Sequence, residues 1–170
     1  MSDIQKFYPI QKWINNPILR KVSVKIDKID EDMQTFGEEL MELMKLYDGA
    51  WLAAPQVWKN IRMIATTQWK ETKKELKLSW ETLMINPEII EKSKEMVISD
   101  EACLSLPHFK GKVRRHKSIV VEYLDLKWKK QSKKLKDLSA FIVQHEYDHL
   151  DGILFADKLI KNSWKWKVES

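Results

Sequence analysis

The chain has 170 residues, of which 44% are hydrophobic and 32% are charged, and its formal net charge is +5 at pH 7. This composition is that of one water-soluble globular domain, and no apolar run approaches the ~18 residues that a membrane span needs. The single cysteine, Cys103, excludes an internal disulfide. Most of the positive charge is lysine rather than arginine, which argues against a specific reader of nucleic acid.

The first segment, residues 1–15, lacks the pattern of a signal or transit peptide. We therefore expect a loose N-terminal arm and a cytoplasmic protein. No repeat or linker divides the remainder, so residues 1–170 are predicted to form a single catalytic domain in which residues 158–170 are a short tail.

A first helix is predicted from about residue 30. Three acidic residues open it, and apolar residues then recur at spacings of three and four. These are Met33, Phe36, Leu40, Leu43, Met44 and Tyr47. The pair Asp48-Gly49 closes the helix, and the apolar stripe is expected to face the core.

Short extended segments follow, at residues 61–66, 82–85, 89–90, 96–98 and 119–124. They are rich in β-branched residues, and the polar stretches between them have the length of hairpins or short connections. This pattern favours largely antiparallel sheet over repeated βαβ units. The lysine-rich stretches 70–77 and 127–136 are predicted to be surface loops or edge strands.

The last helix is predicted over residues 138–150 and carries the strongest chemical signal. His145 and His149 are four residues apart, so their imidazoles lie on one helix face and can bind one metal ion. Glu146 is placed to reach a water on that ion. The overall expectation is an α+β fold in which mostly antiparallel sheets pack around this central helix, with another helix nearer the N-terminus.

The third metal ligand is ambiguous from spacing alone. A protease pattern that adds a third histidine after Gly152 fails, because Phe155 occupies that position. Glu169 has the downstream spacing of another protease class. Cys103 follows an extended segment and would supply a softer, anionic ligand.

Three motifs, in order, resemble those of peptide deformylases. They are Gly-Ala-Trp-Leu-Ala-Ala-Pro-Gln at 49–56, Glu-Ala-Cys-Leu-Ser at 101–105 and Gln-His-Glu-Tyr-Asp-His at 144–149. Stretches 86–89, 111–115 and 151–157 are also similar, so the resemblance runs from about residue 17 to residue 157. It implies a hydrolase of protein biosynthesis that removes the formyl group from N-terminal formyl-methionine of new polypeptides.

The resemblance also implies a ligand set and a cofactor. One divalent metal ion per chain would be held by Cys103, His145 and His149. Ferrous iron is the family's usual native ion, and zinc, nickel or cobalt can occupy the same site. Glu146 would carry the proton between water and the departing amine. The Gln56 side chain and the Leu104 backbone N–H would stabilise the oxyanion.

Substrate contacts are implied as well. The peptide would lie along the first motif at Gly49 and Trp51, and an apolar slot for methionine would be lined by one face of the last helix. The residues of that face are Leu138, Phe141 and Ile142.

Some positions depart from the family pattern. Trp51, Ala102 and Trp58 stand where glycine is usual, which predicts an altered pocket mouth around an intact metal site. Many bacterial members contact the ribosome through a longer C-terminal helix. Here residues 162–170 alternate Trp and Lys near their centre, which predicts a short strand and leaves transient ribosome contact without that helix.

Two other functions fit parts of the sequence. One is a different metal-dependent amidase or peptidase, and the other is a degenerate relative that binds peptide or ribosome without catalysis. A degenerate protein has no need to keep Glu146 together with Gln56 and all three ligands. The sequence therefore favours a deformylase whose partners are formyl-methionyl peptides, with neither specific nucleic acid nor membrane among them.

Overall fold

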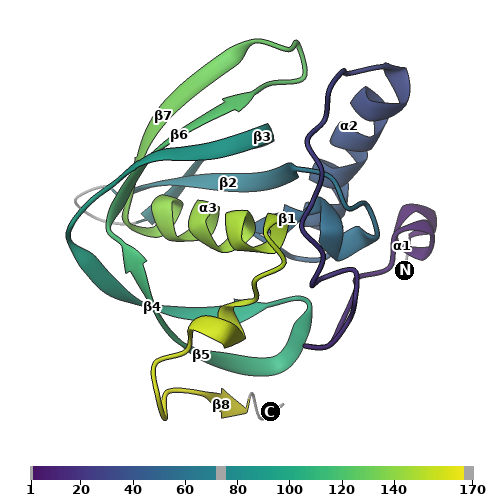
Figure 1. Cartoon of the computed structure of the whole chain (residues 1–170). Coiled ribbons are helices and arrows are strands. Elements are labelled where there is room, and N and C mark those ends of the chain that lie inside the picture. Colours follow the sequence, from purple (N-terminus) through teal and green to yellow (C-terminus); the bar gives the residue numbers. More distant parts are fainter. Residues whose placement is uncertain (1, 72–75, 167–170) are drawn as a thin grey trace.

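The computed structural model describes residues 2–71 and 76–166, in which a long helix lies between two antiparallel sheets (Figure 1). The helices are α1 (Asp3–Phe7), α2 (Glu31–Leu46) and α3 (Asp137–Leu150), with 3-10 turns η1 (Ala54–Val57) and η2 (Phe155–Lys158). The strands are β1 (Trp51–Ala53), β2 (Met63–Glu71), β3 (Leu76–Lys92), β4 (Met96–Cys103), β5 (Leu106–His116), β6 (Ser118–Leu124), β7 (Lys130–Lys136) and β8 (Lys165–Trp166).

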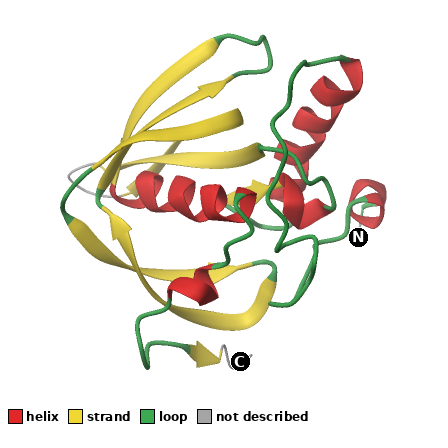
Figure 2. Ribbon diagram, in the orientation of Figure 1, coloured by secondary structure: helices red, strands yellow, loops and turns green. Residues whose placement is uncertain are grey.

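The larger sheet has the strand order β1-β2-β3-β6-β7, and the smaller sheet has the order β4-β5-β8. All pairings between these described strands are antiparallel. Figure 2 shows α3 lying between the sheets, with α2 at one end of the larger sheet. The predicted α+β fold is confirmed. Within the described ranges, no helix is long and apolar enough to cross a membrane.

Two apolar clusters hold the larger sheet between α2 and α3. One joins α2 to the sheet and includes Leu40, Leu43 and Leu52, and the other joins α3 to it and includes Ala53 and Val143. Neighbouring residues of β1 therefore serve opposite faces, as the pleat of a strand requires. By this alternation the side chain at position 51 lies on the α3 side.

Both ends of α2 are capped by local hydrogen bonds. The Asp30 carboxylate accepts from the Met33 N–H at 3.1 Å. At the other end, Gly49 N–H donates to Met44 C=O at 2.9 Å and Asp48 N–H donates to Lys45 C=O at 3.0 Å. This is a Schellman arrangement with Asp48 in the left-handed position at φ 51°. The predicted Asp48-Gly49 stop is confirmed, and it sets the direction of the chain into β1.

The sequence reading missed part of the N-terminal order. Residues expected to form a loose arm include α1, whose capping box links Ser2 and Gln5. Tyr8 follows and is buried, and its ring lies 5.6 Å from that of Phe36 on α2. Gln11 N–H then donates to Gln56 C=O at 2.7 Å. The segment was hard to identify because its contacts are made with distant parts of the chain.

The segments expected at 82–85 and 89–90 belong to one long strand, β3. Asn86-Pro87, between the two expected segments, forms an irregularity at which the ladder to β6 shifts register between Ile85 and Glu88. Asn86 has a φ of 49°, and its side-chain amide makes two hydrogen bonds to the Ile26 backbone.

The two lysine-rich stretches differ in how far their predicted structure can be checked. Residues 130–136 form β7, the edge strand that was one of the two expectations for 127–136. Of stretch 70–77, the ends lie in β2 and β3 and the middle lies outside the described residues. The tail contributes β8, the short strand that the alternating pattern predicts, and this strand pairs with β5.

The end of α3 is fixed by a glycine with no substitute. Gly152 has a φ of +70°, and a Cβ on it would lie 2.5 Å from the Arg20 carbonyl oxygen. The Arg20 guanidinium also pairs with Asp157, just beyond the helix. These contacts fix the final turn of α3, which carries His149.

Trp58 offers a test of backbone strain. It follows η1 in the left-handed region at φ 72°, and its side chain is 59% exposed. We expect Trp58→Gly to raise the free energy of unfolding by about 0.5–1 kcal/mol, measured by urea denaturation, because glycine removes the Cβ conflict. Trp58→Ala is the control, since it keeps the Cβ. An equal gain in both variants would show that loss of the exposed indole, rather than relief of strain, is responsible.

Candidate metal centre

The second and third motifs meet where the end of β4, in the smaller sheet, faces α3. Cys103 ends β4, where a register shift between Ala102 and Cys103 interrupts the ladder to β5. Its Sγ lies 3.2 Å from His149 Nε2. The candidate ligand atoms of Cys103, His145 and His149 all lie within 4.8 Å of one another. One sulfur and two imidazoles, far apart in sequence, are thus gathered around one point.

Unpartnered polar atoms lie beside this cluster. Among the described residues, His145 Nε2 and both carboxylate oxygens of Glu146 are buried and have no hydrogen-bond partner. The two side chains approach to 3.8 Å, between Nε2 and Oε1. Buried polar atoms are normally paired, so an unpaired set next to a cysteine sulfur fits a metal ion and its water.

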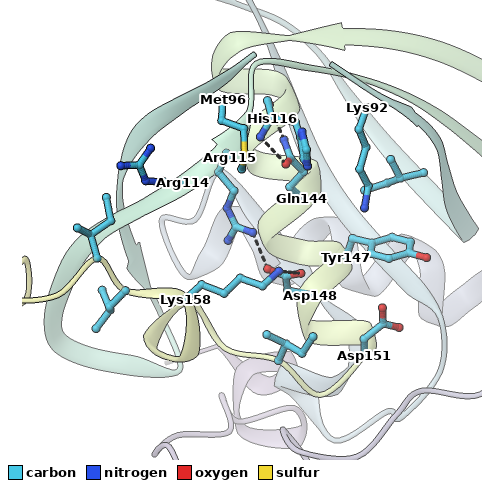
Figure 3. A pocket seen from close by; sticks show the side chains of 14 residues that line it. Lys92, Met96, Arg114, Arg115, His116, Gln144, Tyr147, Asp148, Asp151 and Lys158 are labelled. Carbon is cyan, nitrogen blue, oxygen red and sulfur yellow. Dashed lines mark hydrogen bonds and ion pairs between the residues drawn. The ribbon is translucent and has the colours of Figure 1, made fainter. Parts of the chain in front are cut away.

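An ion-pair chain supports His145 from behind. His145 Nδ1 donates to Glu101 Oε2 at 2.8 Å, and Arg115 donates to both Glu101 oxygens at 2.7 and 2.8 Å. Arg115 also pairs with Asp148, which accepts from Lys158 Nζ at 2.6 Å, as Figure 3 shows. Burial alone raises the pKa of Glu101, but the hydrogen bonds from Arg115 and His145 lower it to about 2. Glu101 is therefore a fixed anion.

The pKa shifts of Glu146, Cys103 and His149 favour the binding of a cation among these three side chains. Burial, with the charge of Glu101, raises the pKa of Glu146 well above its ordinary value. Burial, with the nearby Glu146 carboxylate, raises the pKa of the Cys103 thiol to about 12. Burial, with neighbouring His145, holds the pKa of His149 well below its usual range. A divalent cation reverses the first two effects and uses the neutral imidazole as a ligand.

Gln56 ties the first motif to the second. Its Oε1 accepts from Ala53 N–H at 2.9 Å, and its Nε2 donates to Ser105 Oγ at 3.1 Å and to Cys103 Sγ at 3.5 Å. The predicted neighbours Gln56 and Cys103 are thus brought together. The side-chain amide is held with its nitrogen toward Cys103, one of the candidate metal ligands.

Leu104 follows Cys103 in the turn between β4 and β5. Gly49 lies beside it, since a Cβ on Gly49 would be 3.3 Å from Leu104 Cδ1. The start of the first motif therefore packs against the second. The role of the Leu104 N–H as an oxyanion donor stays a prediction.

The glycine replacements have different settings. The half-buried Trp51 ring lies edge-on to the His145 ring, with centroids 6.3 Å apart. Ala102 is exposed and is not among the described residues with positive φ, so it adopts its strand position without strain. Phe155, at the position where a third histidine was considered, is buried and stacks on His145 at 6.0 Å. Glu169 lies outside the described residues.

Only helical spacing relates the predicted methionine slot to the metal centre. By spacing, Leu138, Phe141 and Ile142 share the His145 face of α3. Phe141 packs against the cluster under the larger sheet, Ile142 is buried and Leu138 is half-buried. Their contact with substrate stays a prediction.

Sequence reasoning missed most of the ion-pair chain. Glu101 opens the second motif and Asp148 lies within the third, but neither had been given a role. Arg115 lies in the similar stretch 111–115, and nothing local indicates Lys158. An acidic residue two positions before a candidate ligand cysteine was the available signal, because metal-bound histidines usually donate their second N–H to a carboxylate.

Comparisons with known proteins agree with this geometry. A family model described as polypeptide deformylase matches residues 8–165. The peptide deformylase of Pseudothermotoga lettingae is 37% identical over 157 residues, which are 92% of this chain and 85% of that protein. The peptide deformylase of Finegoldia magna is 40% identical over 149 residues, which are 88% of each protein.

Solved structures give the same result. The peptide deformylase from Thermotoga maritima has a TM-score of 0.79 at 32% identity, covering 91% of this chain and 98% of that chain. A class I type b peptide deformylase from Acinetobacter baumannii, bound to Met-Ala-Ser, has a TM-score of 0.81 at 30% identity, covering 89% and 98%. The likeness therefore extends over nearly the whole chain.

Removal of the sulfur tests the metal centre. We expect the protein to bind about one divalent ion per chain and Cys103→Ala to bind it at least about tenfold more weakly, because one of three protein ligands is lost. Elemental analysis after dialysis against metal buffers measures both. The control is His116→Ala, which removes an imidazole outside the cluster. Equal metal content in all three proteins would refute the ligand set.

Proposed function

The chain belongs to the peptide deformylase family, and from that membership we propose how its own residues remove the formyl group from N-terminal formyl-methionine. It is a metal-dependent hydrolase, and the reaction releases formate. The observation that carries the proposal is the convergence of Cys103, His145 and His149 beside the buried Glu146. A thiolate, two imidazoles and a proton carrier are the parts that water-driven amide cleavage requires.

Cys103 Sγ and the imidazoles of His145 and His149 would hold the metal ion. When bound, a divalent ion lowers the pKa of a coordinated water and polarises the formyl carbonyl. We take ferrous iron as the native ion, with zinc, nickel or cobalt as substitutes. A mixed sulfur and nitrogen site suits these borderline ions better than magnesium or calcium.

Glu146 moves the proton. Its oxygens are buried, unpartnered and adjacent to the ligand cluster. In this position the carboxylate takes a proton from the attacking water and delivers it to the amine that leaves. The proton taken up in the first transfer leaves Glu146 neutral, so the same side chain is the acid in the second transfer.

Gln56 and Leu104 stabilise the charge that develops on the formyl oxygen. Gln56 is held by Ala53 N–H at Oε1 and by Ser105 Oγ at Nε2, and its second amide N–H, which faces Cys103 Sγ at 3.5 Å, is the donor to the formyl oxygen. The Leu104 backbone N–H is next to Cys103 in the chain and supplies the second donor. Two fixed donors of this kind lower the barrier by several kcal/mol in hydrolases.

The ion-pair chain positions His145 rather than touching substrate. Glu101 fixes the ring by accepting from Nδ1, which leaves Nε2 directed at the ligand cluster. Arg115 in turn fixes Glu101 with two hydrogen bonds. The imidazole therefore keeps its tautomer and orientation whether or not substrate is present.

Substrate binds beside β1, an edge strand of the larger sheet among the described strands. An extended peptide can lie along Gly49 and Trp51 with mainly backbone contacts, which accepts many downstream sequences. The methionine side chain enters the slot beside the His145 face of α3, lined by Leu138, Phe141 and Ile142. Trp51 narrows the mouth of that slot because its ring lies beside His145.

The working partners follow from this activity. New polypeptides that begin with formyl-methionine are the substrates, and the cytoplasm is the proposed location. Ribosome contact is a further proposal. Because residues 165–166 pair with β5 as a strand, such contact has to use another surface than a helix at this point of the chain.

A panel of three peptides tests the activity. Iron- or nickel-loaded protein is incubated with formyl-Met-Ala-Ser, acetyl-Met-Ala-Ser and a peptide with only internal amides, and formate, acetate and new amines are measured. We expect formate alone, because the site accepts the smallest acyl group. Internal cleavage would identify a peptidase, and no product in any tube would identify a protein without catalysis.

Substitution of Glu146 separates proton transfer from metal binding. We expect Glu146→Gln to keep its metal but to lose about 10²–10⁴-fold in kcat, because the amide cannot carry the proton. Metal content and formate release are measured on the same sample. Glu95→Gln, which changes an exposed carboxylate paired with Lys117, is the matched control. Full activity of Glu146→Gln would refute the assigned role.

A further inference from the structure

One face of β5 carries a row of cationic side chains. Lys110, Lys112 and Arg114 are exposed, whereas the residues between them are buried. Because successive side chains of a strand point to opposite faces, these three share one face of β5 and follow one another at steps of about 6.8 Å. Figure 3 shows Arg114 directed away from Arg115, which points to Asp148 in the ion-pair chain. These three residues, the β5 row, therefore lie on the face of the smaller sheet that is turned away from the metal centre.

The β5 row lacks counterions. Its register partners on β4 are, in the same order, Ala102, Asp100 and Ile98, so one carboxylate stands opposite three cations. Within the described ranges, no ion pair joins a member of the row to this carboxylate or to any other. The row therefore presents surplus positive charge to solvent.

Protection of a sheet edge does not explain the row. Lysines on an edge strand prevent its pairing with another chain, and β7 is an edge strand of this kind. β5 instead lies between β4 and β8, and residues 159–163 make further backbone contacts along its second edge. Lysine is also under-represented in strands. A partner of opposite charge accounts for cations at these positions.

The backbone under the row is held in place from the other side. Ser163 Oγ accepts from the Lys112 N–H and donates to the Lys112 C=O, both at 3.2 Å. Ile160 N–H donates to the same carbonyl at 2.8 Å. Gly111 packs so closely against Leu159 that a Cβ would overlap it. The row therefore keeps its spacing when a partner binds, which lowers the ordering cost of binding.

The shape of the row selects the class of partner. It extends over about 14 Å, which suits a linear polyanion better than one compact head group. Lysine and arginine bind phosphate oxygens through charge-assisted hydrogen bonds that carry no sequence information. The apolar register partner, Ile98, is 55% exposed, but one aliphatic side chain on a strand is too small an anchor for a membrane. RNA, with its regular line of phosphates, therefore fits the row best.

We propose that the β5 row binds the phosphate backbone of RNA without preference for sequence. The row and Arg115 lie on opposite faces of β5, so RNA and a formylated peptide can be bound at the same time. The purpose of the contact rests on the proposed function: it holds the enzyme at the RNA-rich ribosome on which its substrates are made. The contact itself does not depend on the deformylase reaction.

Fluorescence anisotropy tests the contact on the metal-loaded protein. The probe is a labelled oligouridylate of about 12 nucleotides, titrated between about 50 and 200 mM salt. We expect binding that weakens as salt rises, because each phosphate contact releases counterions. A polyglutamate peptide and phosphatidylserine vesicles are titrated in parallel. Binding of either one in preference to the RNA would overturn the assignment.

Two triple variants separate the row from bulk charge. The row variant changes all three row residues to glutamine, and the control removes the same charge from exposed positions of the β6–β7 hairpin, as Lys127→Gln, Lys134→Gln and Lys136→Gln. We expect the row variant to bind the RNA at least about tenfold more weakly, with a log–log salt slope less steep by about 2, since each contact with single-stranded RNA contributes about 0.7. The control is expected to change little. Equal weakening by both variants would show a general charge effect and refute the row.

Formate release from formyl-Met-Ala-Ser is measured on the same proteins without RNA, and circular dichroism checks that they fold. We expect the row variant to keep full activity, because the row does not touch the metal centre. Loss of activity in a folded row variant would place the row in the peptide site and overturn the proposal. Normal formate release without RNA binding refutes the row alone, whereas RNA binding without formate release refutes the proposed function alone.

Discussion

The buried carboxylate of Glu101 is the constraint on which the rest of the site depends. It accepts two hydrogen bonds from Arg115 and one from His145 Nδ1, so its charge is fully compensated although it is almost inaccessible to water. Removal of one member of such a group leaves an uncompensated buried charge, which costs about 3–5 kcal/mol. The same bond leaves His145 Nε2 available on the opposite side of the ring. Stability and metal binding are therefore coupled through one side chain of β4.

α3 connects two parts of the molecule with different chemistry. One face carries the ligand histidines, and another carries Asp148, which lines a separate cavity. Asp148 belongs to the second face but pairs with Arg115, which belongs to the support of the first. Because interiors are densely packed, a helix of this kind is placed by both sets of contacts at once. The precision of the metal centre thus rests partly on residues that never meet the substrate.

The limits of sequence reasoning follow from the range of the interactions. His145 and His149 could be identified because helical spacing alone brings them together. Spacing alone does not show which distant residue returns to the helix; the softer, anionic character of cysteine favoured Cys103 over Glu169, and the motif resemblance decided between them. The Lys158 contact with Asp148 was missed for a related reason, because lysines are common and no local pattern indicates which one turns inward.

The strand errors have a local cause. Residues 86–88 separate the two expected segments and do interrupt the ladder to β6, but antiparallel pairing continues on both sides. Local propensity identifies the break between the two segments, but it cannot account for hydrogen bonding to a distant strand, which joins them into one. The positions that replace family glycines show the converse: Ala102 lies in an ordinary strand, and Trp51 follows the alternation of β1 toward α3. Neither residue has a positive φ, so the strands accommodate both side chains without backbone strain at these two positions.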